Sequence, residues 1–299
     1  MTAQRHHLLP SLAIAISGVL WGLFWMPFRK LGESGFDGGW ASLAFYLAAT
    51  LLLAPAALTR WRRLRAAGWD LLLIGAIAGA AFSLYATALL LTEVVRVLLL
   101  FYLTPAWGTL LGFLLLGERV TANRGAALVL GLAGLVVILG FDDGFPLPRN
   151  AGDWLALIAG FAWAYGSLLI YRRPHIEVYE TAFAFFAGGT LVTLIVALLP
   201  IAANEVTPTW RVLEAGWPWL ALLIALFGVP PVVMTLWGAA RLSPGRVGIL
   251  LMGEVVVGIA SAAVWSGEPF GTREALGTVL IVGAGLVETV PRPFAVASR

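Results

Sequence analysis

Long apolar runs of about twenty residues, separated by short polar connections, dominate the chain. Ten such runs can be counted, and each approaches the ~20 residues that a helix needs to cross the hydrocarbon core of a bilayer. They cover residues 9–28, 39–58, 68–91, 97–116, 124–141, 153–171, 179–200, 217–239, 247–266 and 272–289. Strands of a membrane barrel would instead alternate apolar and polar positions over about ten residues, a period that the sequence lacks. The pattern predicts an all-α membrane protein with ten transmembrane helices.

The amino-acid composition agrees with this pattern. Of 299 residues, 60% are hydrophobic and only 12% are charged, about half the charged share of a soluble protein. Too few polar side chains remain to cover a soluble globule, so the lipid bilayer is the expected partner of much of the surface. Cysteine is absent, which excludes disulfides and thiolate metal sites. The three histidines, His6, His7 and His175, lie outside the apolar runs, so we expect neither a metal site nor a cofactor.

Lysine and arginine lie in or next to the connections, where membrane topology explains them better than nucleic-acid binding does. If the N-terminus is cytoplasmic, thirteen of the nineteen basic residues face the cytoplasm and six face outside. The cytoplasmic set is Arg5, Arg60, Arg62, Arg63, Arg65, Arg119, Arg124, Arg172, Arg173, Arg241, Arg246, Arg292 and Arg299, and the outer set is Arg29, Lys30, Arg96, Arg149, Arg211 and Arg273. This asymmetry predicts a bacterial-type inner (plasma) membrane protein with both termini cytoplasmic.

The chain repeats itself after five runs. Ala67-Gly68-Trp69 opens the third run and Ala215-Gly216-Trp217 opens the eighth, while Gly18-Val-Leu-Trp21 in the first run recurs as Gly160-Phe-Ala-Trp163 in the sixth. Because five is an odd number, the second half must enter the membrane from the opposite side. The sequence therefore predicts two inverted five-helix repeats, 1–146 and 147–299. Many secondary transporters have this arrangement, with a substrate site near the midplane between the halves.

Several short motifs recur in a fixed order along both halves. They are Gly18-Val-Leu-Trp21-Gly22, Leu103-Thr104-Pro105, Leu116-Gly117-Glu118-Arg119, Gly160-Phe-Ala-Trp163 and Ser266-Gly267-Glu268-Pro269. In order, spacing and duplication the chain resembles the EamA-type ten-span branch of the drug/metabolite transporter superfamily. Leu250-Leu-Met252-Gly-Glu254 departs from the proline-bearing pattern usual at that place and is similar to the branch that exports amino acids. The resemblance implies a small-metabolite carrier that works by alternating access, most like the YddG-like exporters of aromatic amino acids.

Glu254 is the one acidic residue placed deep in an apolar run. A carboxylate at the bilayer centre costs about 3 kcal/mol on insertion scales, so it normally has a partner or faces a cavity. At helical spacing it shares a face with the small residues Gly258 and Ser261. One interpretation is a contact to the substrate amine or a group that exchanges a proton with it, which makes a proton the candidate coupling ion. The other is an internal hydrogen bond that joins two helices.

Aromatic residues supply further candidates for a substrate site. Trp21 and Trp163 are related by the repeat and lie midway along their runs, whereas tryptophan usually lies at the membrane interface. They are candidates for cavity walls that stack on an aromatic substrate, or for packing between the halves. Weaker candidates of the same kind are Tyr46, Tyr85, Tyr102 and Trp237.

Prolines and glycines inside the runs predict the helix geometry. Pro230 and Pro231 should break the eighth helix locally, and Pro105 should kink the fourth. We interpret all three as candidate hinges, with a static bend as the alternative. Close helix packing is the role expected of the GxxxG pairs Gly18/Gly22, Gly75/Gly79 and Gly108/Gly112.

Catalytic and nucleotide-binding patterns are missing from the sequence. It has no phosphate loop of the form GxxxxGK, no nucleophile elbow and no cluster of acids and histidines. We therefore expect a secondary transporter of a small solute rather than an enzyme or an ATP-driven pump. Export of another metabolite or of a hydrophobic drug remains open. An intramembrane lipid-modifying enzyme and a multi-span scaffold are the alternatives from other classes.

Overall fold

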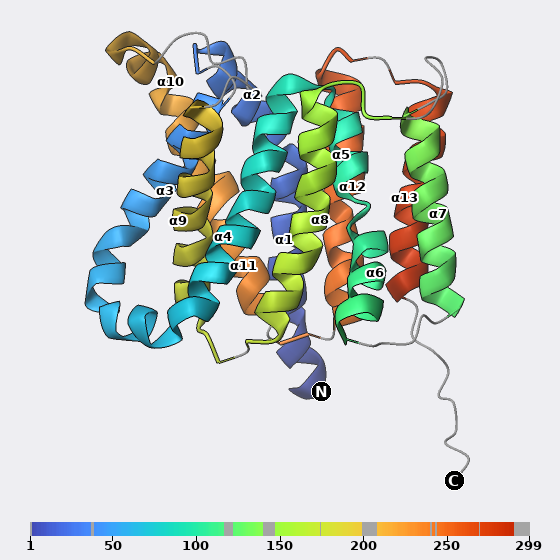
Figure 1. The fold of residues 1–299 in the computed structure, drawn as a ribbon, viewed down its shortest axis with the longest axis horizontal. Helices are drawn as coiled ribbons and strands as arrows, with labels where there is room; N and C mark the ends of the chain where they lie inside the picture. The colour runs from blue at the N-terminus through green and yellow to red at the C-terminus, as the bar shows by residue number, and fades with distance from the viewer. Residues whose placement is uncertain are drawn as a thin grey trace.

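The computed structural model is a bundle of helices that run up and down along one common direction (Figure 1). It describes residues 2–36, 39–116, 122–139, 147–173, 175–198, 208–239, 241–242, 244–268 and 270–289. Within those ranges every regular element is helical, as the apolar runs predict. The motif residues Gly117, Glu118, Arg119 and Pro269 lie outside the described part, and so does the side chain of Pro105.

The helices follow the apolar runs closely. In chain order they are α1 (Thr2–Leu23), α2 (Trp25–Glu33), α3 (Gly39–Thr59), α4 (Trp61–Leu91), α5 (Val94–Phe101), α6 (Thr104–Leu116), α7 (Ala122–Leu139), α8 (Ala151–Tyr171), α9 (Val178–Leu198), α10 (Trp210–Leu222), the π-helical segment η2 (Leu223–Gly228), α11 (Val229–Ala239), α12 (Pro244–Trp265) and α13 (Thr272–Thr289).

Seven helical segments in the described ranges are long and apolar enough to cross a membrane. They are Leu8–Glu33, Gly39–Thr59, Trp61–Leu91, Val94–Leu115, Ala151–Ile170, Val178–Leu198 and Trp210–Ala239. Two shorter apolar helices, Gly125–Ile138 and Gly253–Trp265, fall within the predicted fifth and ninth runs, and α13 coincides with the tenth. The all-helical, multi-span character is thus confirmed, while the number of ten spans stays a prediction.

Pro230 and Pro231 do not break the eighth run, so that expectation is wrong. The chain remains helical through both prolines, and a π-helical turn, η2, comes directly before them. The backbone N–H of Val229 donates to the carbonyl of Ile224, five residues earlier. The prolines then occupy the first turn of α11, where a missing N–H is tolerated best. A widened turn accommodates them in place of a break.

Small residues bring helices from the two predicted halves into backbone contact. A Cβ atom at Gly75 would lie 2.5 Å from the carbonyl oxygen of Ala184, and one at Gly79 would overlap the backbone of α9. The Gly18/Gly22 pair packs α1 against α12 in the same way. The expected packing role is confirmed for these two pairs. It is wrong for Gly108 within the described part of the chain, where nothing lies within 4 Å of a Cβ atom at this position.

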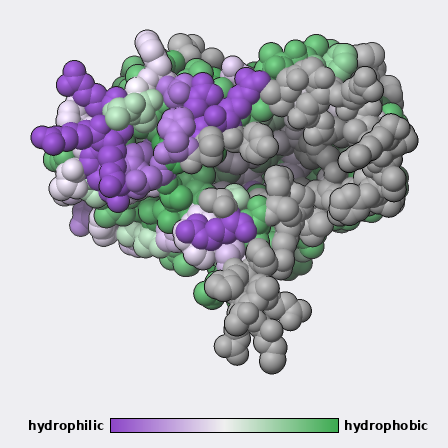
Figure 2. Space-filling model, turned by 90° about the horizontal axis from the view of Figure 1, so that it is seen from below, coloured by the Kyte–Doolittle hydropathy of each residue, from purple (hydrophilic) through white to green (hydrophobic). Residues whose placement is uncertain are grey.

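The bundle has two unlike ends, which we call upper and lower as drawn in Figure 1. The α3–α4 corner and the α8–α9 connection lie at the lower end, and α2 and α10 lie at the upper end (Figure 1). Seen from below, hydrophilic residues gather over one half of the lower end (Figure 2). Around the sides, large apolar side chains such as Trp69, Leu198 and Val264 are exposed, as a lipid-facing surface requires.

We predict that Gly79→Ala destabilises the protein, because the added methyl group must push α4 away from α9. Overpacking of this kind costs about 1–3 kcal/mol, so the thermal unfolding temperature of the purified protein in detergent should fall. Gly108→Ala is the matched control, since its methyl group enters open space and alanine favours a helix over glycine by about 0.5–1 kcal/mol. Equal unfolding temperatures for the two variants would contradict the packing role.

Candidate functional site

The carboxyl group of Glu254 lies at the centre of the bundle. The residue is 3% exposed, and its Oε2 accepts a hydrogen bond from the hydroxyl of Tyr102 at 2.5 Å. Its other oxygen, Oε1, is buried and has no hydrogen-bond partner within the described part of the chain. Gly22 of α1 packs against this turn of α12, where a Cβ atom would lie 2.7 Å from the Glu254 carbonyl oxygen. The internal hydrogen bond expected as one interpretation is therefore present, but it satisfies only one carboxyl oxygen.

Tyr102 reaches Glu254 because the fourth run is interrupted at this residue. Tyr102 and Leu103 form a turn between α5 and α6. Pro105, the second residue of α6, has no N–H to donate to the carbonyl of Phe101. The Thr104 hydroxyl donates to that carbonyl instead, at 2.7 Å. The predicted proline site thus lies at a helix interruption next to the buried carboxyl group, although its action as a hinge stays a prediction.

Phe82 of α4 joins the aromatic side chains around this centre. Its ring centroid lies 5.3 Å from that of Trp21, 5.0 Å from that of Trp163 and 5.4 Å from that of Phe185. Tyr85, one turn further along α4, lies 5.9 Å from Phe82. These separations are typical of tilted and edge-to-face aromatic pairs, each worth about 0.5–1.5 kcal/mol beyond buried area. Phe82 therefore connects the two repeat-related tryptophans.

Two small voids lie on either side of this aromatic group, each of about 20 Å³. Trp21, Phe82, Phe185 and Val232 line both voids and form a partition between them. A volume of this size holds about one water molecule. The centre is therefore closed around its side chains, and a larger solute can enter only if the partition moves.

One lining residue of each void carries a buried polar atom that has no hydrogen-bond partner among the described residues. The first void is lined by Glu254, whose Oε1 has no partner, and the second by Thr235, whose buried Oγ1 also has none within the described residues. Buried polar groups in folded proteins are nearly always hydrogen-bonded, and an exception calls for an explanation such as a bound molecule. The Glu254 and Thr235 oxygens therefore offer a potential hydrogen-bonding site on each side of the aromatic partition.

The structure brings most of the predicted site residues together. Trp21, Tyr46, Tyr85 and Glu254 line the first void, and Trp21 and Trp163 line the second. Trp237 is not among their lining residues; its ring lies under the guanidinium group of Arg241, 4.4 Å from the ring centroid. Sequence reasoning missed Thr235 and the lining phenylalanines, which are Phe24, Phe45, Phe82, Phe185, Phe186 and Phe227. The one sequence signal for Phe82 is its helical spacing from Tyr85.

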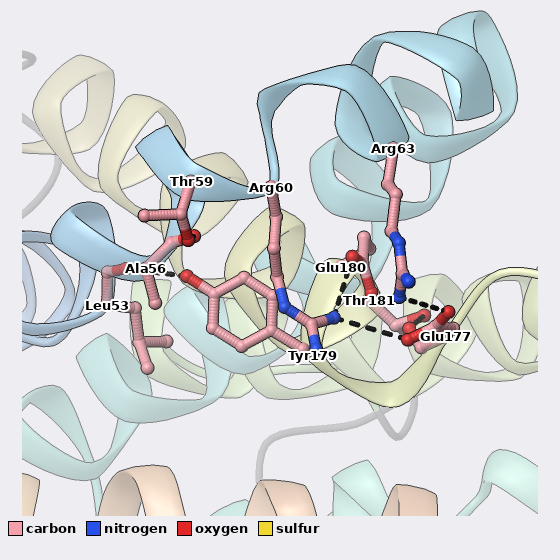
Figure 3. Close-up of polar contacts among 9 residues, drawn as sticks. All are labelled: Leu53, Ala56, Thr59, Arg60, Arg63, Glu177, Tyr179, Glu180 and Thr181. Atoms are coloured by element: carbon pink, nitrogen blue, oxygen red, sulfur yellow. Dashed lines mark hydrogen bonds and ion pairs between the residues drawn. The ribbon is translucent and has the colours of Figure 1, made fainter.

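At the lower end, ion pairs join the α3–α4 corner to the start of α9 (Figure 3). Arg60 contacts Glu180 at 3.0 Å and Glu177 at 3.2 Å, and Arg63 contacts Glu177 at 2.5 Å. The Arg60 guanidinium also lies over the ring of Tyr179, 5.0 Å from its centroid. All of these contacts connect the first predicted half to the second.

At the upper end, a different set of ion pairs joins the same halves. Arg29 of α2 contacts Glu268, the residue three positions after α12, at 2.6 Å. The other carboxyl oxygen of Glu268 accepts the backbone N–H of Val94 at 2.8 Å. Arg96 of α5 forms a buried ion pair with Asp153 of α8. Ion pairs therefore link the two predicted halves at both ends of the bundle.

Comparison with known proteins identifies the family. The sequence pattern of the EamA-like transporter family matches residues 8–140 and 150–287. The chain belongs to the EamA-like transporter family. The predicted resemblance to the drug/metabolite transporter superfamily is thereby confirmed. This EamA-like transporter is a multi-span membrane protein, and its family points to transport rather than to enzymatic catalysis.

Two similar proteins add detail. A Salmonella typhimurium (strain LT2) protein described as a "Probable amino-acid metabolite efflux pump" is 29% identical over 182 residues. That match covers 59% of the EamA-like transporter and 60% of the relative's own length. A solved crystal structure is similar with a TM-score of 0.58 at 21% identity, over 93% of this chain and 96% of that one. At this identity the structural similarity concerns the fold alone.

We predict a measurable energetic coupling between Tyr102 and Glu254. A hydrogen bond to a charged group contributes about 1.5–3 kcal/mol. Tyr102→Phe removes the donor, and Glu254→Gln replaces the charged acceptor by a neutral one. A double-mutant cycle of unfolding free energies in detergent should show that the combined variant loses less stability than the two single variants together. Additive losses would mean that the 2.5 Å contact does not form in solution.

Proposed function

We propose that this EamA-like transporter exports amino acids, aromatic ones first, by alternating access through the centre of the bundle. The observation that carries the proposal is the free Oε1 of Glu254, which lies in a closed aromatic centre. Leaving such an acceptor unsatisfied costs about 1–3 kcal/mol, and more if it is charged. The ammonium group of an amino acid would satisfy it, and a proton would do so when the substrate leaves.

The aromatic partition would select the side chain of the substrate. Trp21 and Trp163 face Phe82 from two sides, so displacement of the Phe82 ring would leave a slot between two indoles. An aromatic side chain would replace the contacts that Phe82 gives up, whereas a small or charged one would not. The Thr235 hydroxyl at the second void could then donate a hydrogen bond to a polar group on the substrate or accept one from it.

The ion pairs at the two ends support alternating access between inverted halves. Arg29–Glu268 at the upper end and Arg60–Glu180 at the lower end each link helices of different predicted repeats. The exposed Arg63–Glu177 pair is of the kind that contributes about 0–1 kcal/mol. The Arg96–Asp153 pair and the Glu180 carboxyl group are buried, so an end that opens has to rehydrate or re-pair these charges. The matches of the family pattern to 8–140 and 150–287 fall on either side of the predicted boundary between repeats and support two halves.

The alternative is export of another metabolite or of a hydrophobic drug. A neutral hydrophobic solute would use the aromatic walls but would leave the Glu254 oxygen unsatisfied. The similarity to a relative named as an amino-acid metabolite efflux pump also favours the amino-acid class. A scaffold, the alternative from another class, would tolerate neutralisation of Glu254.

Transport assays in proteoliposomes test the proposal. Labelled phenylalanine should accumulate faster than leucine, and leucine faster than aspartate. Glu254→Gln should stay folded, and its flux should fall by more than about tenfold. A loss of only about 1.4 kcal/mol in the interaction between the carboxylate and the substrate ammonium group already corresponds to a factor of ten. Glu214→Gln, at an exposed position on α10, is the matched control and should transport normally.

The stability of a third variant separates the two roles of Glu254. If the carboxyl group only joins helices, Glu254→Gln keeps full flux and Glu254→Leu lowers the unfolding temperature. If it binds or exchanges a cation, both variants lose flux whether or not they lose stability. Full flux in Glu254→Gln would remove this residue from the proposed mechanism.

Membrane topology gives an independent prediction. The chain has no native cysteine, so single cysteines can be labelled without background. We expect Lys30→Cys at the upper end to react with an impermeant maleimide on intact cells, and Arg62→Cys at the lower end to react only after permeabilisation. Both wild-type side chains are exposed. The reverse pattern would invert the proposed orientation and turn the proposed exit side into the entry side.

A further inference from the structure

A third and larger cavity lies beside the central voids, near the upper end of the bundle. Its volume is about 410 Å³, against about 20 Å³ for each central void. Residues of α2, of α10 with η2 and of the end of α12 line it, and we call it the vestibule. Pockets that hold small ligands have volumes of about 300–1,000 Å³. The vestibule can therefore admit a solute in the conformation seen here, whereas the centre cannot.

Phe227 separates the vestibule from the Glu254 void and lines both. The side chain is 9% exposed and belongs to η2, the π-helical turn before Pro230. Single π-helical turns inside α-helices are often found at functional sites. If this turn returned to α-helical geometry, the side chain of Phe227 would point in a different direction. Successive residues of an α-helix are rotated by about 100° around the helix axis, so removing the extra residue of the π turn shifts the position of Phe227. Phe227, which separates the two cavities, thus lies on a backbone segment for which both π-helical and α-helical geometry are available.

The walls of the vestibule combine aromatic rings with charges of both signs. Three tryptophans, Trp25, Trp219 and Trp265, contribute to its lining. The Trp25 indole N–H donates to Ser261 at 3.0 Å, which fixes the orientation of that ring. At the rim, Lys30 and Glu33 form an ion pair at 2.6 Å with both side chains more than half exposed. Exposed pairs of this kind exchange partners at little cost in free energy.

This combination fits a zwitterion with an aromatic side chain better than it fits a lipid. The carboxylate of such a solute could pair with Lys30 and its ammonium with Glu33, while its ring packs on the tryptophans. An anionic lipid headgroup would meet Glu33 beside Lys30, and Arg29, the other cation of the lining, is already paired with Glu268. An acyl chain would use neither charge. Both the signs of the charges and the continuity with the centre through Phe227 favour the transported solute.

We infer that the vestibule is a second binding station for the exported amino acid and that Phe227 is the barrier between it and the Glu254 site. The inference rests on the proposed function of amino-acid export. With the predicted topology, Lys30 faces outside, so the station lies on the discharge side. The solute would pause there after leaving Glu254, and the barrier would prevent its return.

Protection of an introduced cysteine tests the station. Leu222→Cys places the only thiol of the chain on the vestibule wall. Millimolar L-phenylalanine should slow its labelling by maleimide about fivefold or more in the purified full-length protein. The same protection is expected with Glu254→Gln added, because the station does not use that carboxyl group. Leu132→Cys, exposed on α7, is the matched control and should label at the same rate with and without phenylalanine.

The possible results separate the inference from the proposed function. Transport of phenylalanine without protection at position 222 overturns the station and leaves the export function intact. Protection that disappears with Glu254→Gln, or protection by phosphatidylglycerol but not by phenylalanine, overturns it too. A wild-type protein that neither transports nor binds phenylalanine removes the proposed function itself.

Substitution of Phe227 tests the barrier separately. Phe227→Trp should slow phenylalanine flux about fivefold or more while leaving the protection at position 222 unchanged, because it obstructs passage without altering the station. A purely structural role for Phe227 predicts that flux and protection fall together with the unfolding temperature. Unchanged flux in a well-folded Phe227→Trp protein would overturn the barrier.

Discussion

Backbone contact between helices of different halves is the constraint on which the rest of this structure depends. Lipid tails are as apolar as leucine, so helices in a bilayer associate through close packing rather than through the hydrophobic effect. Gly22 lets α1 rest on the backbone of α12 at Glu254, and Gly79 does the same between α4 and α9. These contacts set how far apart Trp21, Phe82 and Glu254 can lie, because each is within a few residues of a glycine at a contact.

At the centre that results, the apolar side chains are well packed, but some of the polar groups lack hydrogen-bond partners among the described residues. Phe82 has several aromatic neighbours, whereas Glu254 and Thr235 each retain one buried oxygen without a hydrogen-bond partner among the residues that the structure describes. A structure that needed only stability would fill the same space with apolar side chains at no such cost. Backbone contacts at the glycines and ion pairs at both ends join the predicted halves around these groups.

The sequence predicted the features that repeat along the chain and missed those that arise only in three dimensions. Apolar run length identified the helices, and the lone acid in a run identified Glu254, because both are local signals. Phe82 could not be distinguished from fifteen other phenylalanines, since its importance comes from neighbours on four other helices. Pro230 and Pro231 were expected to break the eighth helix, but the chain stays helical through them with a π-helical turn, an outcome that proline chemistry alone does not choose. Trp237 was a weaker candidate for the same site, and its ring instead lies against Arg241, just after the end of α11.

The π-helical turn η2 also makes the two predicted halves unequal. The helix that the predicted repeat matches to it, α4, contains no such turn. If the halves were identical, exchanging their conformations would produce an outward-open and an inward-open state of equal energy. An additional residue in one turn of one half would remove that equality. If the proposed alternating access holds, an empty carrier of this kind would spend more time facing one side of the membrane than the other. The protein would thus determine on which side it waits for its cargo, while solute and proton gradients alone would still determine the direction of net flow.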